Sequence, residues 1–137
     1  MVIDTSAIIA ILLREPEAPH LARAIEEASP RLLSAANLLE ASMVIETRKG
    51  EAAGRELDLF IYRAGIEIMA VDQEQAEIAR IAWRHYGKGR HPANLNYGDC
   101  FAYALAKATG SPLLFKGDDF SQTDVEKPRL SPSLPPL

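Results

Sequence analysis

Short apolar runs alternate with longer amphipathic stretches from Met1 to Phe115, and this alternation predicts strands and helices in turn. The runs predicted as strands are Met1–Ile3, Leu32–Leu33, Ile66–Val71 and Pro112–Phe115. The stretches predicted as helices are Thr5–Leu13, a segment opened by Pro16 and ending near Ser29-Pro30, Ala35–Arg48, Glu51–Arg63, Asp72–Tyr86 and Tyr97–Thr109. Strands that alternate with helices of about ten or more residues indicate a parallel sheet covered on both faces. We therefore expect an α/β fold, a three-layer α/β/α sandwich around a short-stranded parallel sheet.

The last ten residues differ in composition from the rest of the chain. Pro128–Leu137 contains four prolines, which favours an extended tail or an arm that contacts a partner. We therefore expect one folded domain over residues 1–127 and a proline-rich tail over residues 128–137.

The composition is that of one globular domain. A chain of 137 residues, 47% hydrophobic and 25% charged, is long enough to bury a sizeable core. Its single cysteine excludes an internal disulfide framework and a cysteine-rich zinc site, so we expect an intracellular, cytoplasmic protein. No basic region precedes the apolar run Ala7–Leu13, which indicates neither a signal peptide nor a membrane span. The net charge of −4 argues against a protein that coats nucleic acid through bulk charge, so any such contact needs a local patch.

Two acidic positions follow predicted strands. Asp4 ends the first strand, and Asp118 lies just past the last one. Ligands bind outside the carboxyl ends of the strands in open α/β sheets, so both carboxylates are candidates for one crevice. Each also has a structural explanation, because Asp4 can cap the following helix and Gly117-Asp118-Asp119 is common turn chemistry.

Two further acids lie on apolar helices. Glu40 shares a helix face with Met43 and Val44, and a carboxylate on such a face is seldom buried without a partner. A helix edge that reaches solvent explains Glu40 equally well. Asp99 follows Asn96 at the spacing of a capping box. The helix after it is apolar on most sides, so we expect Asp99 to point toward the interior or a crevice.

Gathering Asp4, Glu40, Asp99 and Asp118 at one site would require a cation. Two unit charges about 4 Å apart repel by roughly 4 kcal/mol at an effective dielectric of about 20. All-oxygen ligands favour Mg²⁺ or Mn²⁺ over zinc. Such a site lowers the pKa of a metal-bound water and stabilises charge on a phosphate during cleavage. The joint pattern therefore predicts metal-dependent phosphodiester chemistry.

Other acid-bearing α/β classes fit the sequence less well. A phosphoacceptor receiver domain needs an aspartate that ends a central strand, whereas Asp72 opens a helix, and adjacent acids after the first strand are absent. A hydrolase with a nucleophilic aspartate requires a second acid two residues after Asp4, where Ser6 stands.

Four short segments, in order, carry a resemblance to a known family. They are residues 2–7 (VIDTSA), 37–40 (NLLE), 95–100 (LNYGDC) and 113–120 (LLFKGDDF). Together, at these spacings, they resemble the PIN domain and, more narrowly, the VapC-type toxins of type II bacterial toxin–antitoxin pairs. The likeness covers Met1 to about Val125, so a PIN-like nuclease domain would occupy residues 1–127.

The resemblance implies a Mg²⁺-dependent endoribonuclease, usually a homodimer, that a VapB-type antitoxin inhibits by occupying the active site. It implies that Asp4, Glu40 and Asp99 line the metal site, with Asp4 and Asp99 as direct ligands. Thr5 and Ser6 would supply hydroxyls to a phosphate or a metal-bound water. The alternative is a non-catalytic PIN-like module that binds RNA or a partner, and the retained acids argue against it.

The fourth acid depends on the alignment with the family. Alignment on Lys116-Gly117 gives Asp118, whereas alignment on Phe120 brings Asp119 closer to the family position. We favour Asp118 and keep Asp119 as the alternative. The family often has Thr or Ser where Lys116 stands, so a hydroxyl role at this position is not expected here.

A local basic patch lies between Glu77 and Asp99, where no acidic residue occurs. Its cations are Arg80, Arg84, Lys88 and Arg90. Trp83 and Tyr86 offer stacking surfaces within the same stretch. We predict that the patch contacts RNA phosphates, and a solvated helix face is the alternative for each cation.

Apolar residues also crowd the helix predicted over 51–63 from two sides. They are Leu57, Leu59, Phe60 and Ile61. This crowding suggests a partner contact in addition to core packing, and either a homodimer face or an antitoxin groove would fit.

Overall fold

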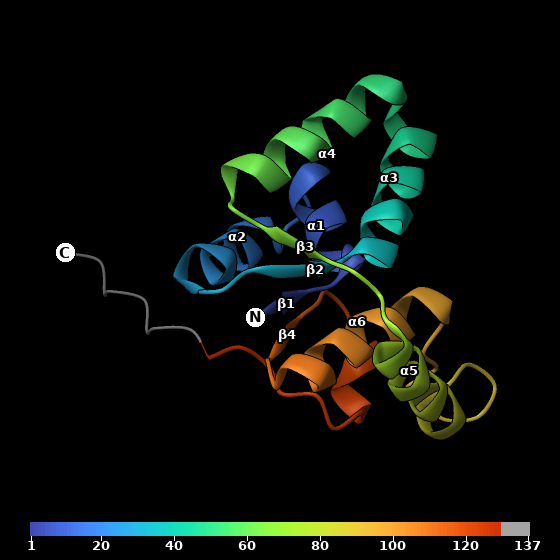
Figure 1. Cartoon of the computed structure of the whole chain (residues 1–137). Coiled ribbons are helices and arrows are strands. Elements are labelled where there is room, and N and C mark those ends of the chain that lie inside the picture. Colours follow the sequence, from blue (N-terminus) through green and yellow to red (C-terminus); the bar gives the residue numbers. More distant parts are fainter. Residues whose placement is uncertain (130–137) are drawn as a thin grey trace.

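The computed structural model describes residues 1–129, and it confirms the predicted alternation of strands and helices (Figure 1). The strands are β1 (Val2–Ile3), β2 (Leu32–Ser34), β3 (Glu67–Met69) and β4 (Leu113–Leu114). The helices are α1 (Thr5–Leu12), α2 (Ala18–Glu27), α3 (Ala35–Lys49), α4 (Glu51–Arg63), α5 (Gln73–Tyr86) and α6 (Tyr97–Thr109), followed by the 3-10 helix η1 (Asp119–Gln122).

The strands form a parallel sheet in the order β3-β2-β1-β4. Val2 of β1 pairs with Leu32 of β2 on one side and with Leu113 of β4 on the other. The chain runs outward from β1 to β2 and β3, then returns through α5 and α6 to β4 on the far side of β1. Such a reversal of strand order opens a crevice at the carboxyl ends of the central strands.

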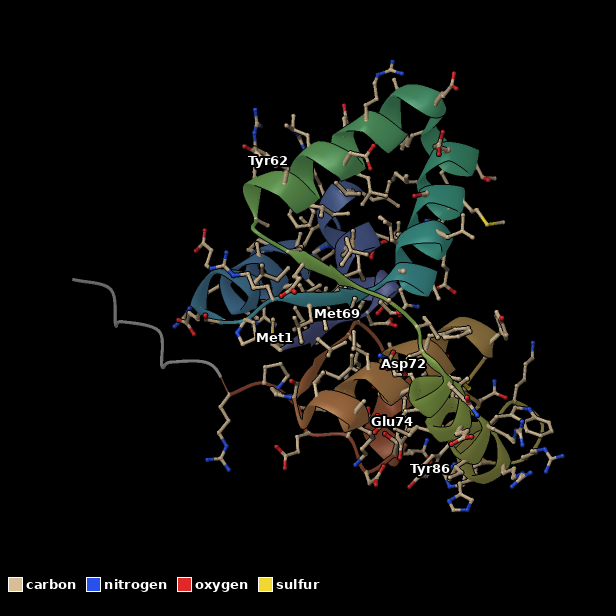
Figure 2. The ribbon with its side chains drawn as sticks, viewed as in Figure 1. Met1, Tyr62, Met69, Asp72, Glu74 and Tyr86 are labelled. Atoms are coloured by element: carbon tan, nitrogen blue, oxygen red, sulfur yellow. The ribbon has the colours of Figure 1, made fainter. Side chains whose placement is uncertain are left out.

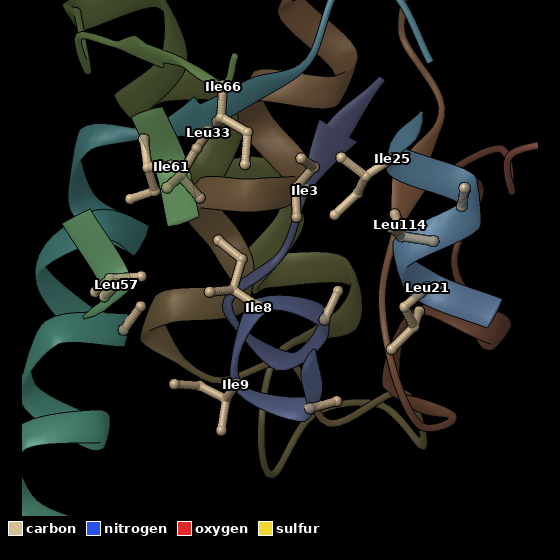
Figure 3. Close-up of a cluster of buried hydrophobic side chains, with 14 of the residues drawn as sticks. Ile3, Ile8, Ile9, Leu21, Ile25, Leu33, Leu57, Ile61, Ile66 and Leu114 are labelled. Carbon is tan, nitrogen blue, oxygen red and sulfur yellow. The ribbon is translucent and has the colours of Figure 1, made fainter. Parts of the chain in front are cut away.

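Helices cover both faces of this sheet, so the predicted three-layer α/β/α sandwich is confirmed. One set of strand residues faces α1, α2, α3 and α4, and its members are Ile3, Leu33 and Leu114. The alternate set faces α5 and α6, and its members are Val2, Leu32 and Leu113. Figure 3 shows the first core, where Ile8 of α1 lies between Ile3 of β1 and Leu57 of α4 in this view. Because successive strand residues point to opposite faces, each short strand serves both cores.

Most element boundaries lie within one residue of the prediction, and two elements differ by more. The second helix begins at Ala18 and not at Pro16, with Pro19 in its first turn, where no backbone N–H is needed for the helix. The third strand is shorter than predicted and lies at the edge of the sheet. Ile66, just before it, is buried in the core with α4, whereas Ile68 within it is 38% exposed.

The described part of the C-terminus returns to the sheet. The backbone N–H of Leu113 donates to the carbonyl of Glu126 over 2.9 Å. Most of the predicted proline-rich tail, from residue 130 onward, lies outside the described residues, so the boundary after residue 127 stays a prediction. Within residues 1–129, no helix combines the length and apolar character needed to cross a membrane.

Candidate active site

A cavity of about 310 Å³ opens at the carboxyl ends of β1 and β4. Five acids from distant parts of the sequence line it: Asp4, Glu15, Glu40, Asp99 and Asp119. Glu15 is paired with Lys116, which leaves the other four as the candidate metal ligands. Asp4 directly follows β1, Glu40 lies on α3, Asp99 lies in the first turn of α6, and Asp119 begins η1. The fold therefore brings Asp4, Glu40 and Asp99 together as the sequence predicts.

Asp4 caps a helix and also lines the cavity. It is 3% exposed, and its Oδ2 accepts a 3.0 Å hydrogen bond from the backbone N–H of Ser6, which caps α1. Its other oxygen, Oδ1, is buried and has no hydrogen-bond partner within the described residues. A buried carboxylate oxygen without a donor is unfavourable unless a ligand or a proton satisfies it.

Asp99 is held by the predicted capping box at the start of α6. Its Oδ2 accepts from the backbone N–H of Asn96 over 3.0 Å, and its own N–H donates to Oδ1 of Asn96 over 2.9 Å. These two bonds fix the carboxylate in the first turn, where the positive end of the helix dipole favours a negative charge. As with Asp4, the carboxylate caps a helix and lines the cavity at the same time.

Glu40 is positioned by a contact between α3 and α6. Asn37, one turn earlier on α3, donates through Nδ2 to Oε1 of Glu40 over 3.2 Å and to the carbonyl of Gly98 over 3.0 Å. A Cβ atom at Gly98 would lie 1.9 Å from Oε2 of Glu40, so only glycine leaves room for this carboxylate. Asn37 and Gly98 both belong to the family-like segments, but no local pattern in the sequence predicts this positioning role.

Burial and neighbouring carboxylates raise the pKa of two acids in the cavity, Asp4 and Asp99. Burial raises the pKa of Asp4 to about 6, and the carboxylate of Glu40 adds to the rise. Burial also raises the pKa of Asp99 to about 7, with further contributions from Asp4 and Asp119. Desolvation and like charges both disfavour the ionised form, so a cation in the cavity would offset both costs.

The donor chemistry of the cavity fits a hard divalent cation. Its acids offer only carboxylate oxygens, which Mg²⁺ and Mn²⁺ prefer, and the unpartnered Oδ1 of Asp4 is one of them. Within residues 1–129, no group of three or more His, Cys, Asp or Glu side chains already converges as a metal cluster. The carboxylates instead line the wall of the cavity.

The two neighbouring candidates for the fourth acid differ in position. Asp119 lines the cavity, and its charge contributes to the raised pKa of Asp99. Both side chains are exposed, but Asp118 does not line the cavity. The geometry thus favours Asp119, the alternative from the alignment on Phe120. The 3-10 helix η1, which the sequence pattern does not predict, begins at this residue.

The predicted hydroxyls line the cavity and also stabilise the fold. Thr5 donates through Oγ1 to the carbonyl of Asn37 over 3.3 Å. Ser6 accepts through Oγ from the backbone N–H of Lys116 over 2.9 Å, a contact that joins the loop after β4 to α1.

Two cations that the sequence analysis did not assign to the site also line the cavity, Arg48 of α3 and Lys116. The ammonium of Lys116 forms ion pairs with Glu15 and with Glu17, the latter at 3.6 Å. Both cations could approach a phosphate held near the acids. Their position follows from the packing of α3 and of the loop after β4 against α1, which no local motif reveals.

The predicted basic patch divides into two parts. Arg80 and Lys88 line a second cavity beside α5, together with Trp83. The guanidinium of Arg90 stacks 4.0 Å from the centre of the Trp83 ring. Arg84 is exposed but does not line this cavity.

Tyr86, one of the two predicted stacking surfaces, is engaged within the domain. Its ring contacts those of His85, His91 and Tyr103. Figure 2 shows Tyr86 on α5, on the side of the molecule opposite Tyr62 of α4. Of the two aromatic rings, Trp83 is the one that lines the second cavity.

The apolar residues that crowd α4 fall into two groups, one in the core and one at the surface. Leu57 and Ile61 of α4 are buried in the core, whereas Leu59 and Phe60 line a surface cavity of about 600 Å³ between α4 and α2. The predicted partner contact can therefore involve Leu59 and Phe60 only.

An α/β/α domain with an acidic cavity at the carboxyl edge of a parallel sheet is the class that the fold and site define. Residues 1–126 match the PIN domain family. The chain belongs to the PIN-domain family and, within it, to the VapC ribonucleases. It is 58% identical to "Ribonuclease VapC" of Mycolicibacterium smegmatis, over 91% of this chain and 97% of that one. It is 57% identical to "Ribonuclease VapC30" of Mycobacterium tuberculosis, over 91% and 95% of the two chains.

Solved structures agree with the fold. VapC20 of Mycobacterium tuberculosis, described as a sarcin-ricin loop cleaving toxin, superposes with a TM-score of 0.73 at 17% identity, over 90% of this chain and 95% of that one. VapBC2 of Rickettsia felis, bound to a DNA fragment from its promoter, gives a TM-score of 0.68 at 16% identity, over 92% and 94%. At these identities the likeness concerns the fold alone.

Proposed function

We propose that this chain is a Mg²⁺-dependent endoribonuclease, the toxin of a type II toxin–antitoxin pair, and that it hydrolyses RNA phosphodiester bonds at a four-carboxylate site. The observation that carries the proposal is the buried Oδ1 of Asp4, which has no partner in the described structure. It lies in a cavity with Glu40, Asp99 and Asp119, and with Glu15, which is paired with Lys116. Membership of the VapC ribonucleases supports the reaction class.

The residues of the acidic cavity would have distinct roles in binding the metal. Asp4 and Asp99 would bind the metal directly, and Glu40 would complete the site with Asp119, which we now prefer to Asp118. When bound, Mg²⁺ or Mn²⁺ would lower the pKa of a coordinated water and stabilise negative charge on the phosphate. Asn37 and Gly98 would hold Glu40 in place through the contacts described above.

Groups around the acids would receive the RNA backbone. Lys116 and Arg48 line the same cavity and could neutralise a phosphate oxygen, while Ser6 and Thr5 present hydroxyls there. The predicted patch of Arg80, Arg84, Lys88 and Arg90 would extend this contact along the strand.

We further propose that a VapB-type antitoxin neutralises the chain, that the chain forms a homodimer, and that it acts in the cytoplasm. The name VapC of the relatives and the VapBC2 assembly of Rickettsia felis support an antitoxin partner. The cavity at Leu59 and Phe60 is a candidate contact for either the antitoxin or the second protomer. Co-purification with the product of an adjacent small open reading frame tests the pairing.

RNA cleavage by a panel of acid variants tests the catalytic site. Asp4→Asn and Asp99→Asn should abolish Mg²⁺-dependent cleavage, and Glu40→Gln should reduce it strongly. Glu46→Gln, on the exposed side of the same helix, is the matched control and should cleave RNA like the wild type. If Asp99→Asn cleaves RNA normally, the carboxylate mechanism is wrong. If no protein of the panel cleaves RNA although all fold, the non-catalytic module is favoured.

The neighbouring pair Asp118→Asn and Asp119→Asn decides the fourth position. We expect the larger loss from Asp119→Asn, because Asp119 lines the cavity and acts on Asp99. A loss confined to Asp118→Asn would instead support the alignment on Lys116-Gly117.

A further inference from the structure

A second cavity, of about 510 Å³, lies between α5 and the start of α6, next to the acidic cavity. Its wall includes Arg80, Trp83, Lys88, Asn96, Tyr97 and Phe101, and we call it the aromatic cavity. This volume lies within the range of small-molecule pockets, roughly 300–1,000 Å³. Asn96 lines both cavities, so the aromatic cavity adjoins the capping box that holds Asp99.

The aromatic side chains of this cavity are unusually accessible. Tyr97 is 82% exposed and Trp83 is 44% exposed, although both belong to helices that pack against each other. Tyr97 makes an edge contact with Phe101 at 4.8 Å, and Arg90 covers one face of the Trp83 ring. Aromatic rings held in this way by their neighbours offer stacking surfaces at a low cost in conformational entropy.

A glycine keeps Trp83 close to the loop that follows α5. A Cβ atom at Gly87 would lie 2.6 Å from Cδ1 of Trp83 and 2.3 Å from its carbonyl oxygen. The loop then returns through Lys88, whose backbone N–H donates to Leu95 over 2.8 Å. The wall of the cavity is therefore built by tight backbone packing and not by a chance arrangement of surface side chains.

The charge at the cavity has one sign. Arg80 and Lys88 line it, no acidic residue does, and Arg90 adds a third cation against Trp83. In a chain of net charge −4, this is a local positive surface around a mainly apolar pocket. Aromatic rings flanked by cations are the arrangement that binds unstacked bases of single-stranded RNA, with the phosphates on the cations.

We propose that the aromatic cavity binds an unpaired nucleobase of the RNA, next to the phosphodiester bond that the acidic cavity cleaves. The inference rests on the proposed ribonuclease function. The base stacks on Tyr97 and Trp83, and Arg80 and Lys88 hold the flanking phosphates. The enzyme consequently selects single-stranded RNA, because a base in a duplex is stacked and paired and cannot enter.

A second copy of the chain is a less suitable occupant. In a two-fold interface the same patch meets itself, so Arg80 and Lys88 would approach their own counterparts. Like charges that face each other across an interface oppose association. An RNA strand brings phosphates that complement Arg80 and Lys88, and bases that can stack on the rings of Trp83 and Tyr97.

Fluorescence of the full chain tests the proposal, because Trp83 is the only tryptophan. The protein is titrated in EDTA with a single-stranded heptaribonucleotide, then with versions in which an abasic ribose replaces one nucleotide at a time. We expect a saturable change in Trp83 fluorescence that is lost with one abasic position. Tyr97→Ala should weaken binding roughly 5- to 150-fold, the range for loss of one stacked base, and Tyr97→Phe should retain it.

Tyr62→Ala is the matched control, since Tyr62 is 83% exposed on α4, remote from α5 (Figure 2). It should bind the oligonucleotide like the wild type. If the chain binds and cleaves RNA but neither Tyr97→Ala nor the abasic series changes the affinity, this inference alone is wrong. Equal binding of a blunt RNA duplex would also overturn it. A Tyr97→Ala chain that sediments as a monomer where the wild type is a dimer would assign the cavity to a second copy. A chain that binds no RNA would refute the proposed function as well.

Discussion

One side chain, Asp4, caps a helix and lies in the acidic cavity at the same time. The cap uses Oδ2, and the other oxygen remains buried without a partner in the described structure. Because the two oxygens of Asp4 differ in this way, the sequence alone could assign Asp4 to the site only together with the other acids, Glu40, Asp99 and Asp118. A cap and a metal ligand leave the same signal, an aspartate between a strand and a helix.

The raised pKa of Asp4 predicts a pH-dependent stability cost in the absence of metal. The unfolded carboxyl ionises near 3.8 and the folded one near 6, so the fold loses stability as the pH rises through this window. The full cost is roughly 3 kcal/mol. Asp4→Asn keeps a good N-cap and avoids the charge, so its stability relative to wild type should increase between about pH 4 and pH 7. Urea denaturation in EDTA at several pH values measures this difference, and a constant difference from pH 4 to pH 8 would contradict the account.

The lack of a Cβ atom at Gly98 leads to a second prediction, about the position of the Glu40 carboxylate. Gly98→Ala places a Cβ where the carboxylate of Glu40 lies, so Glu40 must move, and Mg²⁺ affinity and RNA cleavage should fall about tenfold or more. Gly54→Ala is the matched control on α4, because its Cβ would meet only the exposed and flexible side chain of Glu46. Calorimetric Mg²⁺ titration of both variants provides the comparison. Equal affinities for the two would show that Glu40 does not contribute to the site.

At the level of secondary-structure elements, the acidic cavity depends on the contact between α3 and α6. Asn37 is fully buried and connects Glu40 of its own helix to the backbone of Gly98 on α6. The sequence predicted both helices closely, since their caps and apolar faces are local signals. It did not predict their contact, because the hydrogen bond from Asn37 to Gly98 joins residues 61 positions apart.

Asn37→Ala should therefore uncouple the two helices. Loss of its two hydrogen bonds leaves the carbonyl of Gly98 without that donor, and we expect a loss of about 1–3 kcal/mol in the free energy of unfolding. Ser42→Ala removes a side-chain bond within α3 alone, to the carbonyl of Leu38, and should cost much less. Urea unfolding of the two variants gives the comparison, and similar losses would argue against a special role for Asn37.

For the whole molecule, the order of elements was predictable and the pairing of strands was not. Short apolar runs that alternate with longer amphipathic stretches predicted a parallel sheet between two layers of helices. The two hydrophobic cores, one on each face of the sheet, confirm this prediction. Which strand lies next to β1 is decided by long-range packing, and so is the approach of Arg48 and Lys116 to the acids. Likewise, the choice between Asp118 and Asp119 depends on a 3-10 turn that has no clear local signal.

The predicted domain boundary gives a test at this scale. Truncation after Lys127 should leave folding and RNA cleavage unchanged, because the bond from Leu113 to Glu126 is retained. Truncation after Thr123 removes that bond and Asp124, which accepts from the hydroxyl of Tyr103 over 2.7 Å and pairs with Lys107 at 2.9 Å. It should lower the melting temperature by several degrees, roughly 3–8 °C. A similar loss after Lys127 would place the boundary further along the chain.

The central claim is that the four carboxylates act through a bound metal, and removal of that metal tests it most directly. The purified wild-type chain is treated with EDTA, assayed on single-stranded RNA, and assayed again after Mg²⁺ or Mn²⁺ is added in excess. The account predicts that cleavage stops in EDTA and returns with either ion, but not in the Asp99→Asn variant. Cleavage that continues unchanged in EDTA would contradict it.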